Sequence, residues 1–143
     1  MPIYIACDHA GFELKNILKS KLKNLDLIDL NPVFETGDDY PLVAKNLAIQ
    51  IGESDFGIAI CGTGEGICMA LNRFKNIRAA LVNDPEMAKI VRRHNHANIL
   101  CLAGQNPIIN IDLIIEVIYT FLNTAPDLDQ RHLRRVKELG ELN

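Results

Sequence analysis

The chain has 143 residues, of which 48% are hydrophobic and 23% are charged, and its formal net charge is −3 at pH 7. This length and composition predict a single globular domain that spans residues 1–143. The small negative charge gives no reason to expect nucleic acid or a membrane surface as a partner. No apolar run approaches the roughly 20 residues that cross a bilayer, and the first residues contain charge and lack a basic leader. We therefore expect a cytoplasmic protein.

Short apolar runs alternate with helical patterns along the chain. Buried strands are predicted at 3–7, 27–30, 56–60, 78–82 and 98–102. Helices are predicted at 14–25, at 42–51 with Pro41 in the first turn, from the glycine loop to about Phe74, at 85–93, at 111–123, and at 127–139 with Asp127 as cap. Strands that are apolar on both faces and alternate with helices predict an α/β fold. We expect a Rossmann-like three-layer α/β/α sandwich with a five-stranded parallel sheet and a C-terminal helical tail.

The last predicted helix has too little apolar surface to belong to the core. A tail of this kind is suited to pack on another chain. We therefore expect residues 127–143 to form a C-terminal helix that packs on a partner subunit.

Polar and titratable residues follow several of the predicted strands. Ligands of open α/β sheets bind at the carboxyl ends of the strands. The first strand ends in Cys7, Asp8 and His9, the third ends in "CGTG", and the helix after the fourth stops at "RRHNHAN". We expect these groups to gather at one edge of the sheet and to form the functional site there.

The loop "CGTGEG" (61–66) matches neither common nucleotide motif. A dinucleotide fingerprint needs glycine where Ile67 stands, and a P-loop needs a lysine that is absent. The glycines could do no more than shape a tight turn.

Cys61 makes a catalytic role for this loop more plausible. It precedes a predicted helix N-terminus, where unpaired N–H groups and the helix dipole favour a thiolate. The amides of Gly62, Gly64 and Glu65 could stabilise an oxyanion on a substrate. This combination suits acyl transfer or proton abstraction next to a carbonyl. Because glycines follow Cys61, we expect it at an open edge, whereas the other cysteines are expected to be small buried hydrophobes.

Two histidines and two arginines are further candidates. His9 and His94 could act as acid–base partners, although His9 could instead cap a helix and His94 could end a solvated one. Arg131 and Arg135 share a helix face and could bind a phosphate, although a solvated surface helix would have the same pattern.

The segments "CDHAG", "DYP", "CGTGEG", "NIRAAL", "HNHANIL" and "RHLRRV" occur in this order along the chain. In these segments, from Ile3 to about Val136, the sequence resembles the type B ribose-5-phosphate isomerase family. That family also holds galactose-6-phosphate and allose-6-phosphate isomerases.

The resemblance implies an aldose–ketose isomerase that forms an enediolate and uses neither a metal nor a cofactor. Cys61 would be the base, and His94 would assist ring opening with Asn95 beside it. The other implied site residues are Thr63 and the loop glycines Gly62, Gly64 and Gly66 at the enediolate, Asp8 and Tyr40 at the sugar, and His9, Arg131 and Arg135 at the phosphate.

The resemblance also implies an assembly. The site would be shared across a homodimer, which could pair further into a tetramer. His94, Asn95 and the tail arginines would come from the other subunit.

The chain departs from the family pattern at two places. Gln105 and Asn106 follow the fifth strand, where many relatives have an arginine on the phosphate. Glu65 stands where relatives often have a small or apolar residue, and we expect it to point away from the enediolate.

Three functions remain open at this point. The leading one is interconversion of ribose 5-phosphate and ribulose 5-phosphate in the pentose phosphate pathway. The others are an isomerase of a six-carbon sugar phosphate, either allose 6-phosphate or galactose 6-phosphate, and a non-catalytic Rossmann-like nucleotide-binding module.

Overall fold

A five-stranded parallel sheet forms the centre of the molecule. The computed structural model describes residues 1–142; Asn143, the last residue of the predicted tail, lies outside the described residues. The strands are β1 (Ile3–Cys7), β2 (Leu27–Asp29), β3 (Phe56–Cys61), β4 (Ala79–Leu81) and β5 (Ile99–Ala103). Their order across the sheet is β2-β1-β3-β5-β4. All six residues of β3 are buried, as expected for a central strand covered on both faces.

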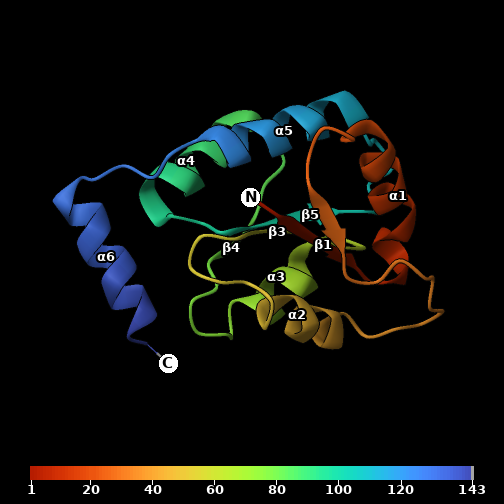
Figure 1. Ribbon diagram of the computed structural model, residues 1–143, viewed down its shortest axis with the longest axis horizontal. Helices are drawn as coiled ribbons and strands as arrows, with labels where there is room; N and C mark the ends of the chain where they lie inside the picture. The colour runs from red at the N-terminus through yellow and green to blue at the C-terminus, as the bar shows by residue number, and fades with distance from the viewer. Residues whose placement is uncertain (143) are drawn as a thin grey trace.

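Helices cover both faces of the sheet and confirm the predicted three-layer fold (Figure 1). One face carries α1 (Phe12–Lys21), α4 (Pro85–Asn95) and α5 (Ile111–Asn123). Their leucine, valine, isoleucine and phenylalanine side chains form one core cluster with the strands. The other face carries α2 (Tyr40–Ala48) and α3 (Glu65–Leu71), which form the second cluster. A short 3-10 helix, η1 (His9–Gly11), joins β1 to α1.

Several helix ends differ from the sequence-based prediction. α1 covers Phe12–Lys21 rather than 14–25, and α2 covers Tyr40–Ala48 rather than 42–51. α3 ends at Leu71 rather than near Phe74. The Asn72 side chain bonds both backbone groups of Ala79, donating to the carbonyl and accepting from the amide, each at 2.9 Å, and the chain turns toward β4 there. α4 runs to Asn95 rather than Arg93, and His96, in the left-handed conformation, closes it.

The C-terminal helix α6 (Gln130–Gly140) starts later than predicted. Asp129 caps it by accepting a hydrogen bond from the Arg131 amide at 3.0 Å. The prediction of Asp127 as the cap is wrong, because the Asp127 carboxylate pairs with the side chain of His132 instead.

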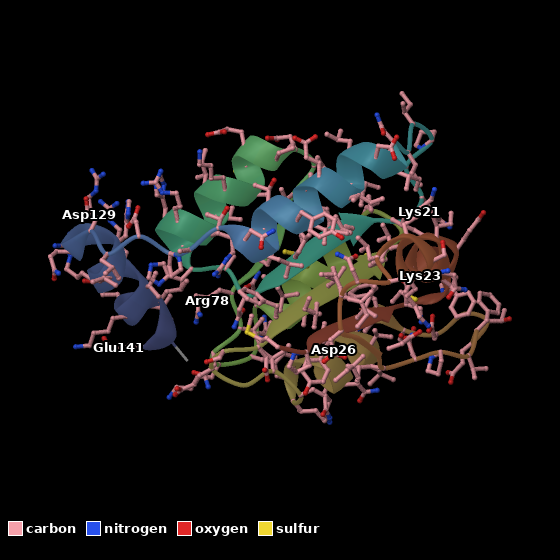
Figure 2. The ribbon with its side chains drawn as sticks, turned by 45° about the horizontal axis from the view of Figure 1, so that its top comes forward. Lys21, Lys23, Asp26, Arg78, Asp129 and Glu141 are labelled. Carbon is pink, nitrogen blue, oxygen red and sulfur yellow. The ribbon has the colours of Figure 1, made fainter. Side chains whose placement is uncertain are left out.

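α6 stands clear of the sheet and contacts α4 (Figure 1). Figure 2 shows Asp129 and Glu141 at its two ends, with Arg78 on the side toward the sheet. Within α6 the structure buries His132 and leaves most other residues exposed. Among the described residues no helix is long and apolar enough to cross a membrane.

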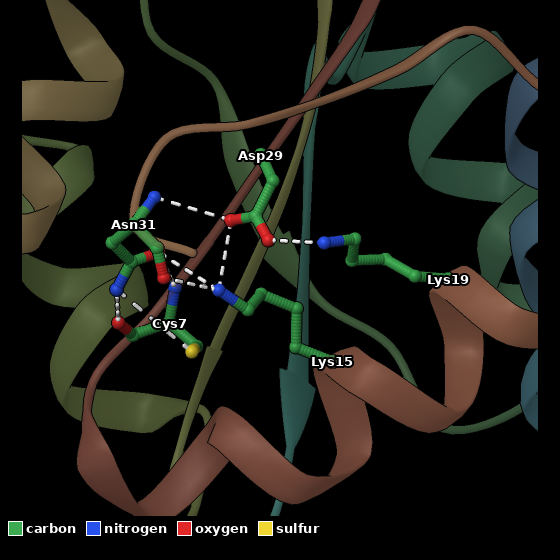
Figure 3. A network of polar contacts seen from close by, with 5 residues as sticks. All are labelled: Cys7, Lys15, Lys19, Asp29 and Asn31. Atoms are coloured by element: carbon green, nitrogen blue, oxygen red, sulfur yellow. Dashed lines mark hydrogen bonds and ion pairs between the residues drawn. The ribbon is translucent and has the colours of Figure 1, made fainter. Parts of the chain in front are cut away.

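A buried ion-pair network ties α1 to β2 and to the loop that follows it (Figure 3). Lys15 is fully buried, and its Nζ donates to Asp29 Oδ1 at 2.8 Å and to the Asn31 carbonyl at 2.5 Å. Lys19 reaches the other oxygen of Asp29 at 2.6 Å. Burial opposes the charge of Asp29, but the two lysines outweigh it and lower the pKa of this carboxyl. The side chain of Asn31 accepts a hydrogen bond from the Cys7 amide and donates one to the Cys7 carbonyl. These two bonds fix the start of the loop 31–39 at the end of β1.

Candidate active site

Three loops converge at the carboxyl edge of the sheet, at the switch point between β1 and β3. The Asp8 amide donates to the Ile60 carbonyl at 3.1 Å, which places the end of β1 beside Cys61. The amides of Gly104 and Gln105 donate to the carbonyls of Cys61 and Gly62 at 2.8 and 2.9 Å. The glycine loop is thus held between the ends of β1 and β5.

Gly64 shapes the glycine loop. Its φ is +79°, a conformation that other residues rarely adopt, and an added Cβ would lie 2.5 Å from Leu81 Cδ1. Among the described residues, the amides of Gly62 and Gly64 have no hydrogen-bond acceptor.

Thr63 and Glu65 complete the loop. The Glu65 amide donates to Thr63 Oγ1 at 3.2 Å, so of the three amides considered for an oxyanion this one already has an acceptor. Because Thr63 Oγ1 already accepts this bond, its hydroxyl proton can be donated toward a ligand. The Glu65 side chain is exposed at the first position of α3.

Cys61 is the last residue of β3 and is only 4% exposed. The expectation of an open edge is wrong for a single chain, because its side chain belongs to the core cluster under α2 and α3, with Ala44, Ile67 and Leu71. Cys7 and Cys101 are buried as expected, and burial raises the pKa of the Cys7 thiol to about 11. Cys7 therefore stays a protonated thiol at working pH.

Asp8 has a structural role at the end of β1. Its Oδ1 accepts hydrogen bonds from the amides of Ala10 and Gly11 at 3.0 and 3.2 Å and so caps η1. Burial raises the pKa of this carboxyl. The second carboxylate oxygen accepts no hydrogen bond from the described residues, which leaves it available to a ligand.

His9 is exposed at the same edge and is held by Asp38. The Asp38 carboxylate lies 2.9 Å from His9 Nδ1 and accepts from the His9 amide at 2.7 Å. This hydrogen bond raises the pKa of the imidazole and favours its charged form. Sequence reasoning missed Asp38 because in "GDDYP" it looks like an ordinary turn residue.

Tyr40 lies on the glycine loop side of α2. A Cβ on Gly66 would be 2.8 Å from Tyr40 Cζ, so the absence of a side chain at Gly66 makes room for the phenol ring. Tyr40 thus comes beside the loop that carries Cys61 and Thr63.

Gln105 and Asn106 follow β5, at the place where the sequence resemblance implies an arginine. The two side chains differ in their surroundings. Gln105 Oε1 lies 3.2 Å from where a Cβ on Gly62 would be, so its amide covers the glycine loop. Asn106 Oδ1 accepts from the Ile108 amide at 3.0 Å and shapes the next turn. Of the two, Gln105 is therefore the residue that contacts the glycine loop.

The remaining predicted residues lie elsewhere in the chain. His94, Asn95 and Arg135 line one pocket with His132, Val136 and Leu139. Arg131 is exposed on α6, with Nε 3.3 Å from Asp129 Oδ2. Arg78, just before β4, donates to the carbonyl of His96 at 2.8 Å, which places the end of α4 at the amino edge of the sheet.

The prediction that His94 shares an edge with Cys61 is therefore wrong within one chain. A crossover helix starts at the carboxyl edge, where its strand ends, and finishes at the opposite edge, where the next parallel strand begins. α4 follows this rule, so its last turn carries His94 away from the glycine loop.

One group of side chains has the residue types of a metal site. His94, Asp127 and His132 offer ligand atoms that all lie within 4.8 Å of one another. They stand at the junction of α4 and α6, not at the glycine loop.

Comparison with known proteins gives one consistent family. The family model described as Ribose/Galactose Isomerase matches residues 3–139. The crystal structure of ribose 5-phosphate isomerase from Thermotoga maritima has a TM-score of 0.90 and 43% identity, covering 99% of this chain and 98% of that one.

Two Mycoplasma proteins are also similar. Ribose-5-phosphate isomerase B from Mycoplasma genitalium, solved with bound ribulose-5-phosphate, has a TM-score of 0.84 and 37% identity over 98% of this chain and 94% of its own. A probable ribose-5-phosphate isomerase B from Mycoplasma pneumoniae is 41% identical over 145 residues, covering 96% of this chain and 92% of that protein.

The fold and these matches define an enzyme of the isomerase class rather than a non-catalytic nucleotide-binding module. The chain belongs to the ribose/galactose isomerase family.

Proposed function

We propose that the protein interconverts ribose 5-phosphate and ribulose 5-phosphate, with Cys61 as the base. The observation that carries the proposal is the position of Cys61 at the end of β3, directly before a glycine loop whose amides of Gly62 and Gly64 are free to bind an oxyanion. The similar proteins named above, one of them solved with ribulose-5-phosphate, support this choice of sugar.

The proposed reaction moves one proton between carbon atoms. The Cys61 thiolate takes the proton from C2 of the open-chain aldose, and the electron pair forms the C1=C2 bond while O1 gains negative charge. The proton returns to C1, the C2=O2 carbonyl forms, and the proton of O2 passes to O1. Loop amides and the Thr63 hydroxyl would stabilise the enediolate oxygens.

The phosphate and the sugar ring would be held by residues from two subunits. His9, whose charged form Asp38 favours, would bind the phosphate from the glycine-loop side. Arg131 and Arg135 would complete that site from α6 of a partner subunit, together with His94 and Asn95. The separation of these residues from Cys61 within one chain supports a homodimer, as do the exposed leucines at the ends of α6, Leu128, Leu139 and Leu142.

Ribose 5-phosphate and ribulose 5-phosphate are exchanged in the pentose phosphate pathway, in the cytoplasm, and we place the protein there. A second candidate substrate is galactose 6-phosphate, because the matching family model covers both sugars. Gln105 and Asn106 are uncharged and stand where the family resemblance implies an arginine on the phosphate. The choice between the two sugar phosphates is therefore made by measurement.

The test is an initial-rate assay with ribose 5-phosphate, galactose 6-phosphate and allose 6-phosphate, with a chelator present. We expect ribose 5-phosphate to be the best substrate. Cys61→Ala should lose about a hundred- to ten-thousand-fold in kcat, the contribution of a proton-transfer catalyst. Cys68→Ala, which removes a half-buried thiol from α3, is the matched control and should keep its activity.

Full activity of Cys61→Ala would contradict the proposed base. A clear preference for a six-carbon substrate would replace the proposed sugar. Absence of turnover with all three sugars would contradict the isomerase proposal as a whole.

A further inference from the structure

We propose that Asp127 and His132 are positioning residues that hold the His94 imidazole for opening the sugar ring. This inference rests on the proposed function, in which His94 assists ring opening. It concerns two residues that the sequence patterns assigned to no step.

Asp127 is fixed at the end of α4 by its own backbone. Its amide donates to the Arg93 carbonyl at 3.1 Å, and its carbonyl lies 3.2 Å from His96 Nε2. These two contacts join the segment before α6 to the last turn of α4. The carboxylate is therefore presented to His94 from a fixed backbone.

The carboxylate of Asp127 serves two histidines. Oδ1 lies 2.8 Å from His132 Nδ1, a hydrogen bond, and Oδ2 lies 3.9 Å from His94 Nε2, an electrostatic contact. The bond to His132 lowers the pKa of Asp127, which keeps the carboxylate charged at working pH.

His132 forms a platform under His94. The two rings stack with centroids 4.3 Å apart and planes 29° from parallel. The side chain of His132 is 8% exposed and that of His94 is 42% exposed. Stacking on a buried, anchored ring restricts the plane of His94 while the rest of its surface stays open to a ligand.

This arrangement suits the proton transfers of ring opening. In that step the C1–O4 bond of the furanose breaks, the C1=O1 carbonyl forms, and the proton of O1 passes to O4. His94 would accept the first proton and return it to O4. A fixed anion beside Nε2 stabilises the imidazolium that exists between the two transfers.

Other polar and charged groups lie around Asp127, from the end of α4 and from the α6 side. Arg93 Nη2 lies 3.9 Å from Asp127 Oδ2, and His96 contacts its carbonyl, both from the end of α4. On the α6 side the Asp129 amide donates to Asp127 Oδ1 at 3.3 Å, and Arg135 lines the pocket of His94 and His132. The cationic groups strengthen the case for a permanently charged Asp127.

The same three residues could be considered as metal ligands, but their geometry disfavours this use. The lone pairs of an imidazole lie in the ring plane, so two rings stacked 4.3 Å apart hold them in separate layers rather than aiming them at one point. His132 Nδ1 is moreover occupied by the hydrogen bond to Asp127.

The experiment separates ring opening from the chemistry at Cys61. Ribulose 5-phosphate cannot close a five-membered ring because its O5 carries the phosphate. Exchange of solvent deuterium into its C1 therefore needs the Cys61 step but not ring opening. Turnover of ribose 5-phosphate, which is mostly a furanose, needs both.

We expect Asp127→Asn and His132→Phe each to lower ribose 5-phosphate turnover about tenfold, less than the loss of an acid–base catalyst itself. Deuterium exchange at C1 of ribulose 5-phosphate should change by less than about twofold, which also shows that the variants fold. Glu138→Gln is the control for Asp127→Asn. It also removes one negative charge, but from an exposed site on α6, and it should behave as the wild type.

Each other outcome contradicts the inference. Equal loss of turnover and exchange would assign Asp127 and His132 a purely structural role, and wild-type turnover in both variants would assign them none. Stoichiometric zinc that is bound by the wild type and lost in Asp127→Asn would make the group a metal site. If the wild type itself turns over no sugar phosphate, the proposed function fails first, which distinguishes the two failures.

Discussion

The charged form of His9 is favoured by Asp38, a residue 29 positions later in the chain. The hydrogen bond raises the pKa of the imidazole, so His9 keeps its proton to a higher pH than a free histidine. A protonated His9 attracts a phosphate dianion, whereas a neutral one offers only a hydrogen bond. Substrate affinity should therefore weaken as the pH rises through the raised pKa.

Asp38→Asn should shift this weakening to lower pH, because the imidazole loses the partner that favours its charged form. The KM for ribose 5-phosphate should begin to rise earlier in a series from about pH 5 to pH 9, the range of imidazole titration, with kcat less affected. Asp39→Asn is the control, because the side chain of Asp39 makes no capping bond. Identical KM profiles for Asp38→Asn and the wild type would contradict this role.

The residues of the glycine-loop edge could be predicted to different degrees from the sequence. Cys61 ends β3, and Thr63 and the glycines follow it directly, so their place at the carboxyl end of the strand was predictable. Asp38 and Gln105 act through contacts with residues far away in the chain, His9 and Gly62. No local pattern shows such contacts.

At the element scale, the Lys15–Asp29 pair joins α1, β2 and the loop that carries Asp38. Lys15 and Lys19 contact the same carboxylate, but Lys15 is fully buried whereas the side chain of Lys19 is 36% exposed. Removing one member of a buried pair leaves polar groups without compensation, whereas an exposed pair contributes little.

Lys15→Met should therefore lower the free energy of unfolding by about 3 kcal/mol. Lys19→Met should lower it by less than about 1 kcal/mol, because water screens the exposed ammonium. Urea unfolding of the two variants measures the difference. Equal losses would show that burial does not set the strength of this network.

Element type was predictable from the sequence, whereas several element ends were not. The strands are apolar on both faces, and their predicted bounds differ from the structure by one residue at most. The end of α3 depends on Asn72 bonding Ala79, and the start of α6 depends on Asp127 being taken by His132. Asp127 and Asp129 in "PDLDQ" are equally good candidates for the cap in the sequence. Only the contact between Asp127 and His132 distinguishes them.

At the scale of the whole molecule, the predicted site residues fall into two groups. Cys61, Thr63, Asp8, His9 and Tyr40 stand at the carboxyl edge, whereas His94, Asn95 and Arg135 stand where α4 meets α6. Neither group alone contains the proposed base, the proposed ring-opening histidine and the arginines proposed to bind the phosphate. A second copy of the chain, related by a two-fold axis, would supply two complete sites.

Mixed dimers test this account most directly. Chains with Cys61→Ala and chains with Arg131→Ala are each expected to form dimers of low activity with ribose 5-phosphate. When they are unfolded, mixed in equal amounts and refolded together, half of the dimers pair one chain of each kind, and one of the two sites in such a dimer has both residues intact. The account predicts recovery to about a quarter of wild-type activity. No recovery, with mixed dimers demonstrated by mass spectrometry, would contradict a site in which Cys61 works with the arginine of a partner subunit.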